Sequence, residues 1–254
     1  MADSVYLIPV CEIPFIQPGD DLAGLIYTAT QKTGLTLTAT DIIVIAQKVV
    51  SKAEDCFVKL TSVSPSARAL ELAEVTGKPA ALIEVILWDT AEVIRARPGL
   101  LIVEHKLGFI SANAGIDHSN VSPEPDTLLR LPLDPDASAW NIRQRLTELS
   151  GIAPPVLIID SHGRPWRKGT AGVVIGLSGI APVQDLRGTP DLFGEPLQYT
   201  DVGFADQIAA AATLLMGQAA EGCPVVIVRG VSFVVDNEAK AADVLRARDM
   251  DVFR

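Results

Sequence analysis

Short apolar runs rich in β-branched residues recur along the chain, and each of them gives way to polar residues. Runs of about four to eight such residues are typical of strands that are buried on at least one face. This pattern predicts strands at Val5–Val10, Asp41–Ile45, Leu100–Val103, Phe109–Ala112, Val156–Ile159, Gly172–Leu177 and Val225–Val228.

Longer segments place apolar residues three and four positions apart, which is the spacing of one helix face. The predicted helices are Asp21–Thr33, Ser66–Thr76, Ala80–Leu87, Ser138–Leu149, Asp201–Met216 and Ala239–Arg246. Asp136 or Ser138 is expected to cap the fourth helix, and Gly217 is expected to end the fifth. Strands and helices do not alternate strictly, which favours an α+β fold over a doubly wound parallel sheet.

The proline- and acid-rich segment Val121–Asp126 is predicted to be a surface loop. A chain of 254 residues can form one large domain or two smaller ones. Composition places no boundary between two such domains, and the chain contains no internal repeat.

The composition excludes several classes of protein. Hydrophobic residues make up 48% and charged residues 20% of the chain, as in globular proteins. The net charge of −10 argues against a nucleic-acid partner. Cys11, Cys56 and Cys223 have no CxxC spacing, so neither a disulfide framework nor a zinc site is expected. No signal peptide or membrane-spanning run is apparent, and a cytoplasmic location is predicted.

Polar residues cluster where two of the predicted strands end. Asp117 lies in the small, polar stretch Ser111–Val121, and Asp160 directly follows the strand Val156–Ile159. Two carboxylates at adjacent strand ends would form an oxygen-rich pocket suited to Mg²⁺ or Mn²⁺, with phosphate oxygens completing the coordination. The alternative is that each aspartate only caps its own turn, and spacing alone does not decide between the two.

Two basic clusters also follow predicted strands. Arg164 and Arg167, with Lys168 next to them, could bind a phosphate or a carboxylate, or they could form a solvated turn. Lys48 and Lys52 follow the strand that ends at Ile45 and present the same two alternatives. Two such clusters in an acidic protein favour anion binding modestly.

The histidines and the common nucleotide motifs give less information. His105, His118 and His162 lack metal-binding spacing, and the last two lie beside the two aspartates, as candidate proton shuttles or as residues of a pocket wall. The chain contains no P-loop, GxGxxG, HExxH or GxSxG motif. Any nucleotide site must therefore be of a less common kind.

Taken in order and with their spacing, several segments resemble the coenzyme F420-0:L-glutamate ligases (the CofE-like family). The segments that carry the resemblance are Ile13–Asp21, Gln47–Glu54, Ser111–Val121, Leu133–Ala139, Asp160–Arg167, Asp191–Gly194, Ala205–Ala211, Met216–Gln218 and Pro224–Gly230. The resemblance implies one ligase domain over residues 1–254, with two subdomains, in an intertwined homodimer. Because the chain ends at Arg254, no C-terminal nitroreductase-like domain is expected.

The resemblance also implies a site at which GTP and a divalent metal, Mg²⁺ or Mn²⁺, meet, with K⁺ as an additional candidate. The implied metal ligands are Asp117, Asp160, Ser161 and Gln218, and the implied catalytic residues are Asp117, Asp160, Lys52 and Arg164. The implied GTP contacts are Ile13, Pro14, Phe15, Ile16, Gln47, Lys48, Lys52, Asn120, Met216, Gly217, Gln218, Ala219, Ala220, Glu221, Gly222 and Cys223.

The activity implied by the resemblance is ligation of L-glutamate to coenzyme F420-0, through an acyl phosphate made with GTP. Two alternatives stay open: an amide ligase that acts on another carboxylate, and a non-catalytic protein that binds a nucleotide or a deazaflavin. The chain departs from the family at Glu12, where Gly is frequent, and at His162, where Phe or Asn is common. The first departure bears on the nucleotide loop and the second on acceptor preference.

Overall fold

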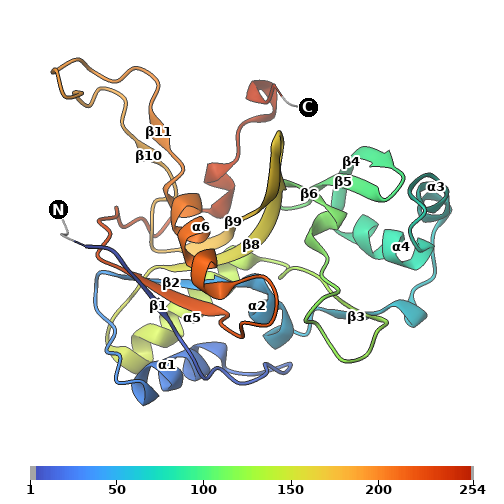
Figure 1. The fold of residues 1–254 in the computed structure, drawn as a ribbon, viewed down its shortest axis with the longest axis horizontal. Coiled ribbons are helices and arrows are strands. Elements are labelled where there is room, and N and C mark those ends of the chain that lie inside the picture. Colours follow the sequence, from blue (N-terminus) through green and yellow to red (C-terminus); the bar gives the residue numbers. More distant parts are fainter. Residues whose placement is uncertain (1–3, 253–254) are drawn as a thin grey trace.

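The computed structural model describes residues 4–252, and a five-stranded sheet forms its centre (Figure 1). The strand order is β1-β12-β2-β8-β9. β2 and β8 run parallel, and the other neighbouring pairs run antiparallel. The strands are β1 (Tyr6–Pro9), β2 (Asp41–Ala46), β8 (Val156–Arg164), β9 (Arg167–Ser178) and β12 (Val225–Arg229).

Helices cover both faces of this sheet (Figure 1). They are α1 (Leu22–Lys32) and α5 (Pro135–Ser150) on one face and α6 (Phe204–Met216) on the other. In β2, Ile43 and Ile45 pack into the core that contains α1 and α5. Ile42 and Val44 pack into the core that contains α6. A strand buried on both faces is apolar at successive positions, which explains the unbroken apolar run of β2.

Two glycines of β9 allow these helices to lie close to the sheet. A Cβ atom at Gly176 would lie 2.5 Å from backbone atoms of Pro135, at the start of α5. A Cβ atom at Gly172 would lie 2.6 Å from the carbonyl oxygen of Ala209 in α6. Any side chain at either position would push the sheet and the helix apart.

A second region has its own sheet and its own core. The sheet has the order β4-β5-β6 and packs with two helices around a cluster that includes Ile83, Ile86, Leu101 and Val103. The elements are α3 (Ala67–Thr76), α4 (Ala80–Trp88), β4 (Thr90–Arg97), β5 (Leu100–His105) and β6 (Ile110–Ala112). The division into two subdomains fits this separate core, and it stays a prediction.

Shorter elements connect these regions. They are α2 (Gln47–Ala53), β3 (Phe57–Lys59), β7 (Thr127–Leu129), β10 (Gln184–Asp185), β11 (Asp201–Val202) and the 3₁₀ turns η1 (Leu60–Ser62), η2 (Asn113–Gly115), η3 (Ala241–Val244) and η4 (Arg248–Met250). β3 pairs with β7, and β10 pairs with β11 at the base of a protruding arm (Figure 1). Among residues 4–252, no helix has both the length and the apolar character that a membrane span requires.

The structure confirms the α+β class, since helices and several separate sheets are mixed in one chain. Every predicted strand is present, although the exact ends differ, and α2, β3, β4, β7, β10 and β11 were not predicted. Gly217 ends α6, as predicted.

Three predictions about helices are wrong. The helix predicted at Ala239–Arg246 is only the short turn η3, because Asp136 accepts a hydrogen bond from the Ala241 N–H and holds this segment against α5. The predicted helix start at Asp201 is wrong because Asp201–Val202 pairs with β10.

The cap predicted for α5 is also wrong, because Asp134 rather than Asp136 or Ser138 caps this helix. The carboxylate of Asp134 accepts a hydrogen bond from the Ala137 N–H. Pro135, which follows the cap, suits the first position of a helix because its own nitrogen has no hydrogen to leave unpaired.

Candidate active site

The small, polar stretch around Asp117 adopts an unusual backbone conformation. Asn113, Ala114 and Asn120 have φ angles of 54°, 53° and 57°. Asparagine tolerates this left-handed region better than most residues, and small residues limit the steric cost. Beyond the turn η2, the backbone of Asp117 exchanges two hydrogen bonds of 2.9 Å with Leu129. The pairing with Leu129 therefore holds the backbone of Asp117 in a defined position.

Asp160 lies within a strand and not at the end of one, which corrects the prediction from sequence. β8 continues through Asp160 to Arg164, and Asp160 is paired with Val173 of β9. The pairing register shifts between Ile158 and Ile159, just before this point. A bulge of this kind changes the direction of the following side chains and is common next to functional sites.

A pocket of about 780 Å³ lies between these two aspartates. Its wall comes from β8, the first turns of α2, the loop around Asp117, the segment before Leu22 and the loop after α6. It contains every residue predicted as a metal ligand or GTP contact, namely Ile13, Pro14, Phe15, Ile16, Gln47, Lys48, Lys52, Asn120, Asp117, Asp160, Ser161 and the loop 216–223. The structure thus brings together segments that are far apart in sequence.

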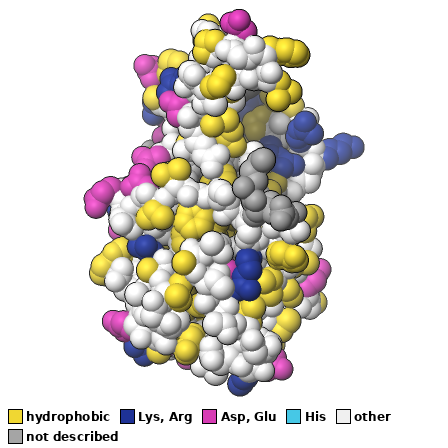
Figure 2. Space-filling model, turned by 90° about the vertical axis from the view of Figure 1, so that its left-hand side faces the viewer, with side chains coloured by type: hydrophobic (Ala, Val, Ile, Leu, Met, Phe, Trp, Pro, Cys, Tyr) yellow, Lys and Arg dark blue, Asp and Glu magenta, His cyan; other side chains and the backbone are white. Residues whose placement is uncertain are grey.

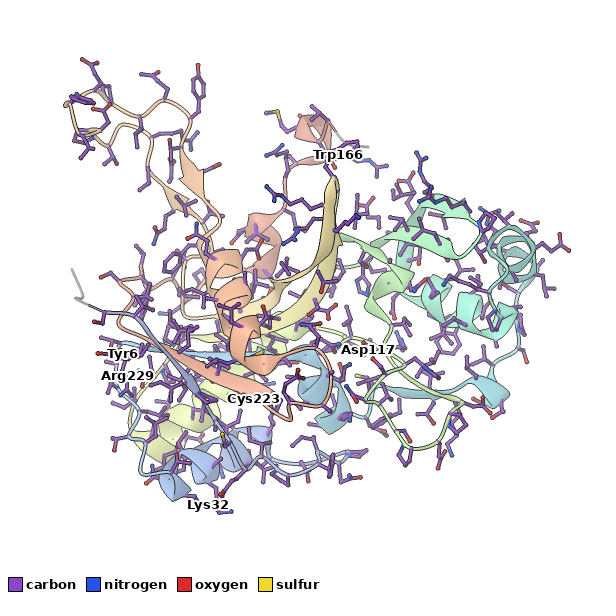
Figure 3. The ribbon with its side chains drawn as sticks, in the orientation of Figure 1. Tyr6, Lys32, Asp117, Trp166, Cys223 and Arg229 are labelled. Carbon is purple, nitrogen blue, oxygen red and sulfur yellow. The ribbon has the colours of Figure 1, made fainter. Side chains whose placement is uncertain are left out.

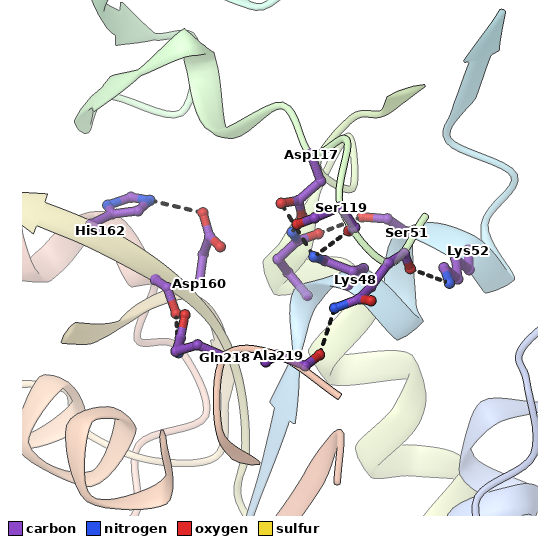
Figure 4. A network of polar contacts seen from close by, with 12 residues as sticks. Lys48, Ser51, Lys52, Asp117, Ser119, Asp160, His162, Gln218 and Ala219 are labelled. Atoms are coloured by element: carbon purple, nitrogen blue, oxygen red, sulfur yellow. Dashed lines mark hydrogen bonds and ion pairs between the residues drawn. The ribbon is translucent and has the colours of Figure 1, made fainter. Parts of the chain in front are cut away.

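A network of hydrogen bonds orients Asp117 (Figure 4). Gln47, at the start of α2, donates from Nε2 to Asp117 Oδ2 over 2.5 Å, and Ser51 Oγ donates to Gln47 Oε1 over 2.8 Å. Lys48 Nζ lies 3.3 Å from Asp117 Oδ1 and donates to the carbonyl oxygen of Ser119. One turn of helix therefore supplies both the amide and the ammonium group that hold this carboxylate.

The loop after α6 is tied to the opposite walls of the pocket by two hydrogen bonds (Figure 4). Gln218 Nε2 donates to Ser161 Oγ over 2.9 Å, and Asn120 Nδ2 donates to the carbonyl oxygen of Ala219 over 2.7 Å. Lys52 Nζ donates to the carbonyl oxygen of Asn120 over 2.8 Å. The loop that contains Asp117 is thus connected to both the helix α2 and the loop after α6.

Burial shifts the pKa of two charged groups in the pocket, Asp117 and Lys52. Burial raises the pKa of the Asp117 carboxyl, Lys48 opposes this rise, and the nearby negative charge of Asp160 adds to it. Burial also lowers the pKa of Lys52, and the positive charge of Lys48 lowers it further. Two carboxylates and two lysines therefore share a partly buried pocket, in which charges interact more strongly with a bound ion than they would in bulk water.

The donor set fits a hard divalent cation. Asp117 and Asp160 offer carboxylate oxygens, and Ser161 and Gln218, which share a hydrogen bond, offer a hydroxyl and an amide oxygen in the same pocket. The described residues contain no group of three or more His, Cys, Asp and Glu that could hold a metal. An ion here would complete its shell with water or phosphate oxygens, as Mg²⁺ and Mn²⁺ do.

Arg164 lies outside this pocket. It is exposed near the turn of the hairpin that β8 forms with β9, and it is absent from the pocket wall. Figure 3 shows Trp166, at that turn, well away from Asp117. Arg164 is therefore not part of the pocket that contains Lys48 and Lys52, and its catalytic role stays a prediction.

The three histidines differ in their surroundings. His162 Nε2 lies 3.0 Å from Asp160 Oδ2, whereas His118 Nε2 lies 2.7 Å from the carbonyl oxygen of Pro125. His105 is buried, which lowers its pKa to about 4. Only one of the two predicted shuttles therefore contacts an aspartate of the pocket.

Some residues of the pocket wall were not predicted from sequence. They are Ala46, Val49, Ser119, Val121, Ser122, Pro123, Ile159, Thr170, Thr213 and Pro224. Ser119 lies inside the polar stretch Ser111–Val121, and Thr213 lies three residues before Met216, which is the spacing of one helix face. Thr170 is brought to the pocket only by the pairing of β9 with β8, and the sequence gives no signal for it.

The α+β fold places carboxylates and lysines together in one pocket, as in enzymes that bind small charged molecules. The chain belongs to the F420-0:gamma-glutamyl ligase family, whose model matches residues 11–230. Members of this family are ligases that form amide bonds.

Three relatives show how far the similarity extends. The coenzyme F420:L-glutamate ligase of Methanothermobacter thermautotrophicus is 44% identical over 251 residues, which cover 98% of this chain and 99% of the relative. The enzyme of the same name from Methanopyrus kandleri is 43% identical over 242 residues, or 94% of this chain and 93% of the relative. The one from Archaeoglobus fulgidus is 41% identical over 250 residues, or 98% and 96%. The similarity includes every segment of the pocket.

Proposed function

We propose that this protein joins L-glutamate to coenzyme F420-0 in a reaction that consumes GTP and requires Mg²⁺ or Mn²⁺. The observation that carries the proposal is the convergence of Asp117, Asp160, Lys48 and Lys52 on one pocket, in a chain that belongs to this ligase family. Further γ-linked glutamates would be added in the same way. K⁺ is an additional candidate ion.

An acyl phosphate intermediate explains why such a pocket would suit the reaction. A carboxylate is a poor acylating agent because oxide is a poor leaving group. If a carboxylate oxygen of the acceptor attacks the γ-phosphorus of GTP, GDP leaves and the carboxylate becomes an acyl phosphate. The amino group of glutamate then attacks the acyl carbon, phosphate leaves, and an amide bond forms after the nitrogen loses a proton.

The residues of the pocket would bind and orient the reactants rather than act as nucleophiles. Lys48 and Lys52 would contact phosphate oxygens and offset the negative charge of the transition state. Asp117 and Asp160, with Ser161 and Gln218, would hold the divalent ion. Such an ion, when bound, neutralises charge on phosphate oxygens. Small residues in the loop 216–223 would let the backbone approach the nucleotide closely.

The direct test is mass spectrometry of F420-0 after incubation with the protein, GTP, Mn²⁺ and L-glutamate. We expect a product heavier by one glutamyl residue, with GDP and phosphate released in equal amounts. A panel of other carboxylate acceptors, read by phosphate release, tests the alternative of an amide ligase with a different acceptor. Nucleotide binding without any turnover would instead indicate a non-catalytic relative.

Ligation is expected to depend on GTP more than on ATP. Selectivity for guanine requires buried groups that pair with the guanine edge and that adenine would leave unpaired. Each lost partner costs about 1–3 kcal/mol. We therefore expect kcat/KM for GTP to exceed that for ATP by at least about tenfold. Equal values for the two nucleotides, measured with saturating acceptor and glutamate, would contradict this prediction.

We also propose a homodimer. The arm between β10 and β11 leaves the body of the chain (Figure 1) and presents Leu192, Phe193 and Tyr199, which are 99%, 91% and 90% exposed. Figure 2 shows that hydrophobic side chains lie among scattered charged ones on the face that contains this arm. Light scattering is expected to give twice the chain mass of 27.0 kDa, and a monomer mass at micromolar concentration would refute the dimer.

A further inference from the structure

The side chain of His162 is fixed on two sides. Its Nε2 atom lies 3.0 Å from Asp160 Oδ2, and the two side chains are only 11% and 16% exposed. The ring of Phe109 lies 5.0 Å from the imidazole, tilted by 50°. Phe109 is itself stacked on the buried ring of His105, with 4.8 Å between centroids. The imidazole therefore has little freedom to leave Asp160.

His162 and Asp160 are two positions apart in β8, so their side chains lie on the same side of the strand. An ionised carboxylate only accepts hydrogen bonds, so Nε2 of His162 must be the donor. One oxygen of Asp160 is thereby occupied. Figure 4 shows the carboxylate of Asp160 between His162 on one side and Asp117 on the other. Oδ1 is the oxygen left for a ligand between the two aspartates.

We propose that His162 is a positioning residue that fixes the rotamer of Asp160 and presents its Oδ1 atom to the divalent ion. This inference rests on the proposed function, because it takes Asp160 as a metal ligand. Hydrogen bonds from outside the coordination shell orient metal ligands, and losing one typically weakens metal affinity by about 10–100-fold. Because a single hydrogen bond is lost, we expect an effect near the lower end of that range.

The chain provides a matched control. His118 follows Asp117 directly, yet its Nε2 atom is 2.7 Å from the carbonyl oxygen of Pro125, and the residue is not part of the pocket wall. Both histidines are adjacent in sequence to a predicted metal ligand. Only His162 has a hydrogen bond to one.

Three substitutions at position 162 separate the hydrogen bond from the volume of the ring. Gln places its side-chain nitrogen as far from the backbone as Nε2 of histidine, so His162→Gln keeps the donor. Asn places it only as far as Nδ1, so His162→Asn keeps an amide that cannot reach Asp160. His162→Phe keeps a ring against Phe109 and removes the donor.

The experiment is a titration of the protein with Mn²⁺ in the presence of GDP, in which electron paramagnetic resonance reports free Mn²⁺ and no turnover is needed. We expect His162→Phe and His162→Asn to raise the Kd for Mn²⁺ about tenfold, with His162→Gln and the control His118→Gln within about threefold of wild type. Melting curves of the same samples identify any variant that is unfolded. His162→Phe and His162→Asn both lack a donor that reaches Asp160 but differ in side-chain volume, so both should weaken Mn²⁺ binding to a similar extent.

The outcomes distinguish this inference from the proposed function. If Asp160→Asn weakens Mn²⁺ binding but neither donor-free variant does, the positioning role is wrong while the metal site stands. If Asp160→Asn binds Mn²⁺ like wild type, the metal site itself is wrong and the inference falls with it. If His162→Gln is as weak as His162→Phe, restoring a donor at the same distance does not restore Mn²⁺ binding, and the inference is overturned.

Discussion

Replacing either Asp117 or Asp160 with asparagine is expected to abolish metal-dependent glutamate ligation while the protein stays folded. Each carboxylate would give a negative oxygen to a cation that also contacts triphosphate oxygens, whereas an amide gives only a dipole. Losing several kcal/mol of charge stabilisation corresponds to a fall of at least about 10³-fold in rate. Initial rates across a Mn²⁺ titration measure the effect.

The expected cost in stability is small, for reasons that the structure provides. An asparagine at 117 can still accept the hydrogen bond that Gln47 donates. Folding raises the pKa of Asp117, so the ionised carboxylate costs stability at neutral pH, and an amide removes that cost. We expect the free energy of unfolding of the metal-free protein to stay within about 0.5 kcal/mol of the wild-type value or to rise slightly above it.

The matched control for both variants is Asp126→Asn. Asp126 is exposed in the same connecting segment as Asp117 and lies outside the pocket wall. This variant should ligate glutamate at the wild-type rate. If either variant also keeps near-normal turnover and unchanged metal dependence, that aspartate only stabilises the local backbone, and the assignment of the metal site is wrong.

The sequence predicts the central sheet well because its signal is local. β2 is buried on both faces and is therefore apolar at every position from Ile42 to Ile45. The helix α2, in contrast, has only seven residues and contains Val49 and Val50, so it offers neither a clear period nor strong helix propensity. As a result, the sequence alone does not show that Lys48 and Lys52 lie one helical turn apart.

The candidate site could be predicted only in part, because its geometry depends on contacts between distant segments. Asp117 and Asp160 stand out as polar residues after apolar runs. Their proximity, however, depends on the loop that pairs with Leu129 and on the parallel pairing of β8 with β2. Arg164 shows the limit of the sequence pattern. It is only four residues beyond Asp160, but each residue of an extended strand advances about 3.3 Å, and the hairpin carries it out of the pocket.

Replacing Lys52 with methionine is expected to lower kcat/KM for GTP by about 10²-fold. Methionine keeps much of the length of the side chain and removes the charge. A hydrogen bond to a charged group contributes about 1.5–3 kcal/mol, so losing one to a phosphate oxygen accounts for an effect of this size. Lys32→Met is the control, because Lys32 is exposed at the end of α1 (Figure 3) and should behave like wild type.

The pH dependence tests the same residue in a second way. Burial and the charge of Lys48 lower the pKa of Lys52 from its usual value of 10.5, and the protonated form is the one that would bind phosphate. Activity should therefore fall as pH rises through this lowered pKa, so the alkaline limb of kcat/KM lies below 10.5. In Lys52→Arg the guanidinium stays protonated, and we expect some activity to return with the limb moved to higher pH. An alkaline limb that is the same in wild type and Lys52→Arg would mean that another group titrates, and that Lys52 does not carry the charge on which the reaction depends.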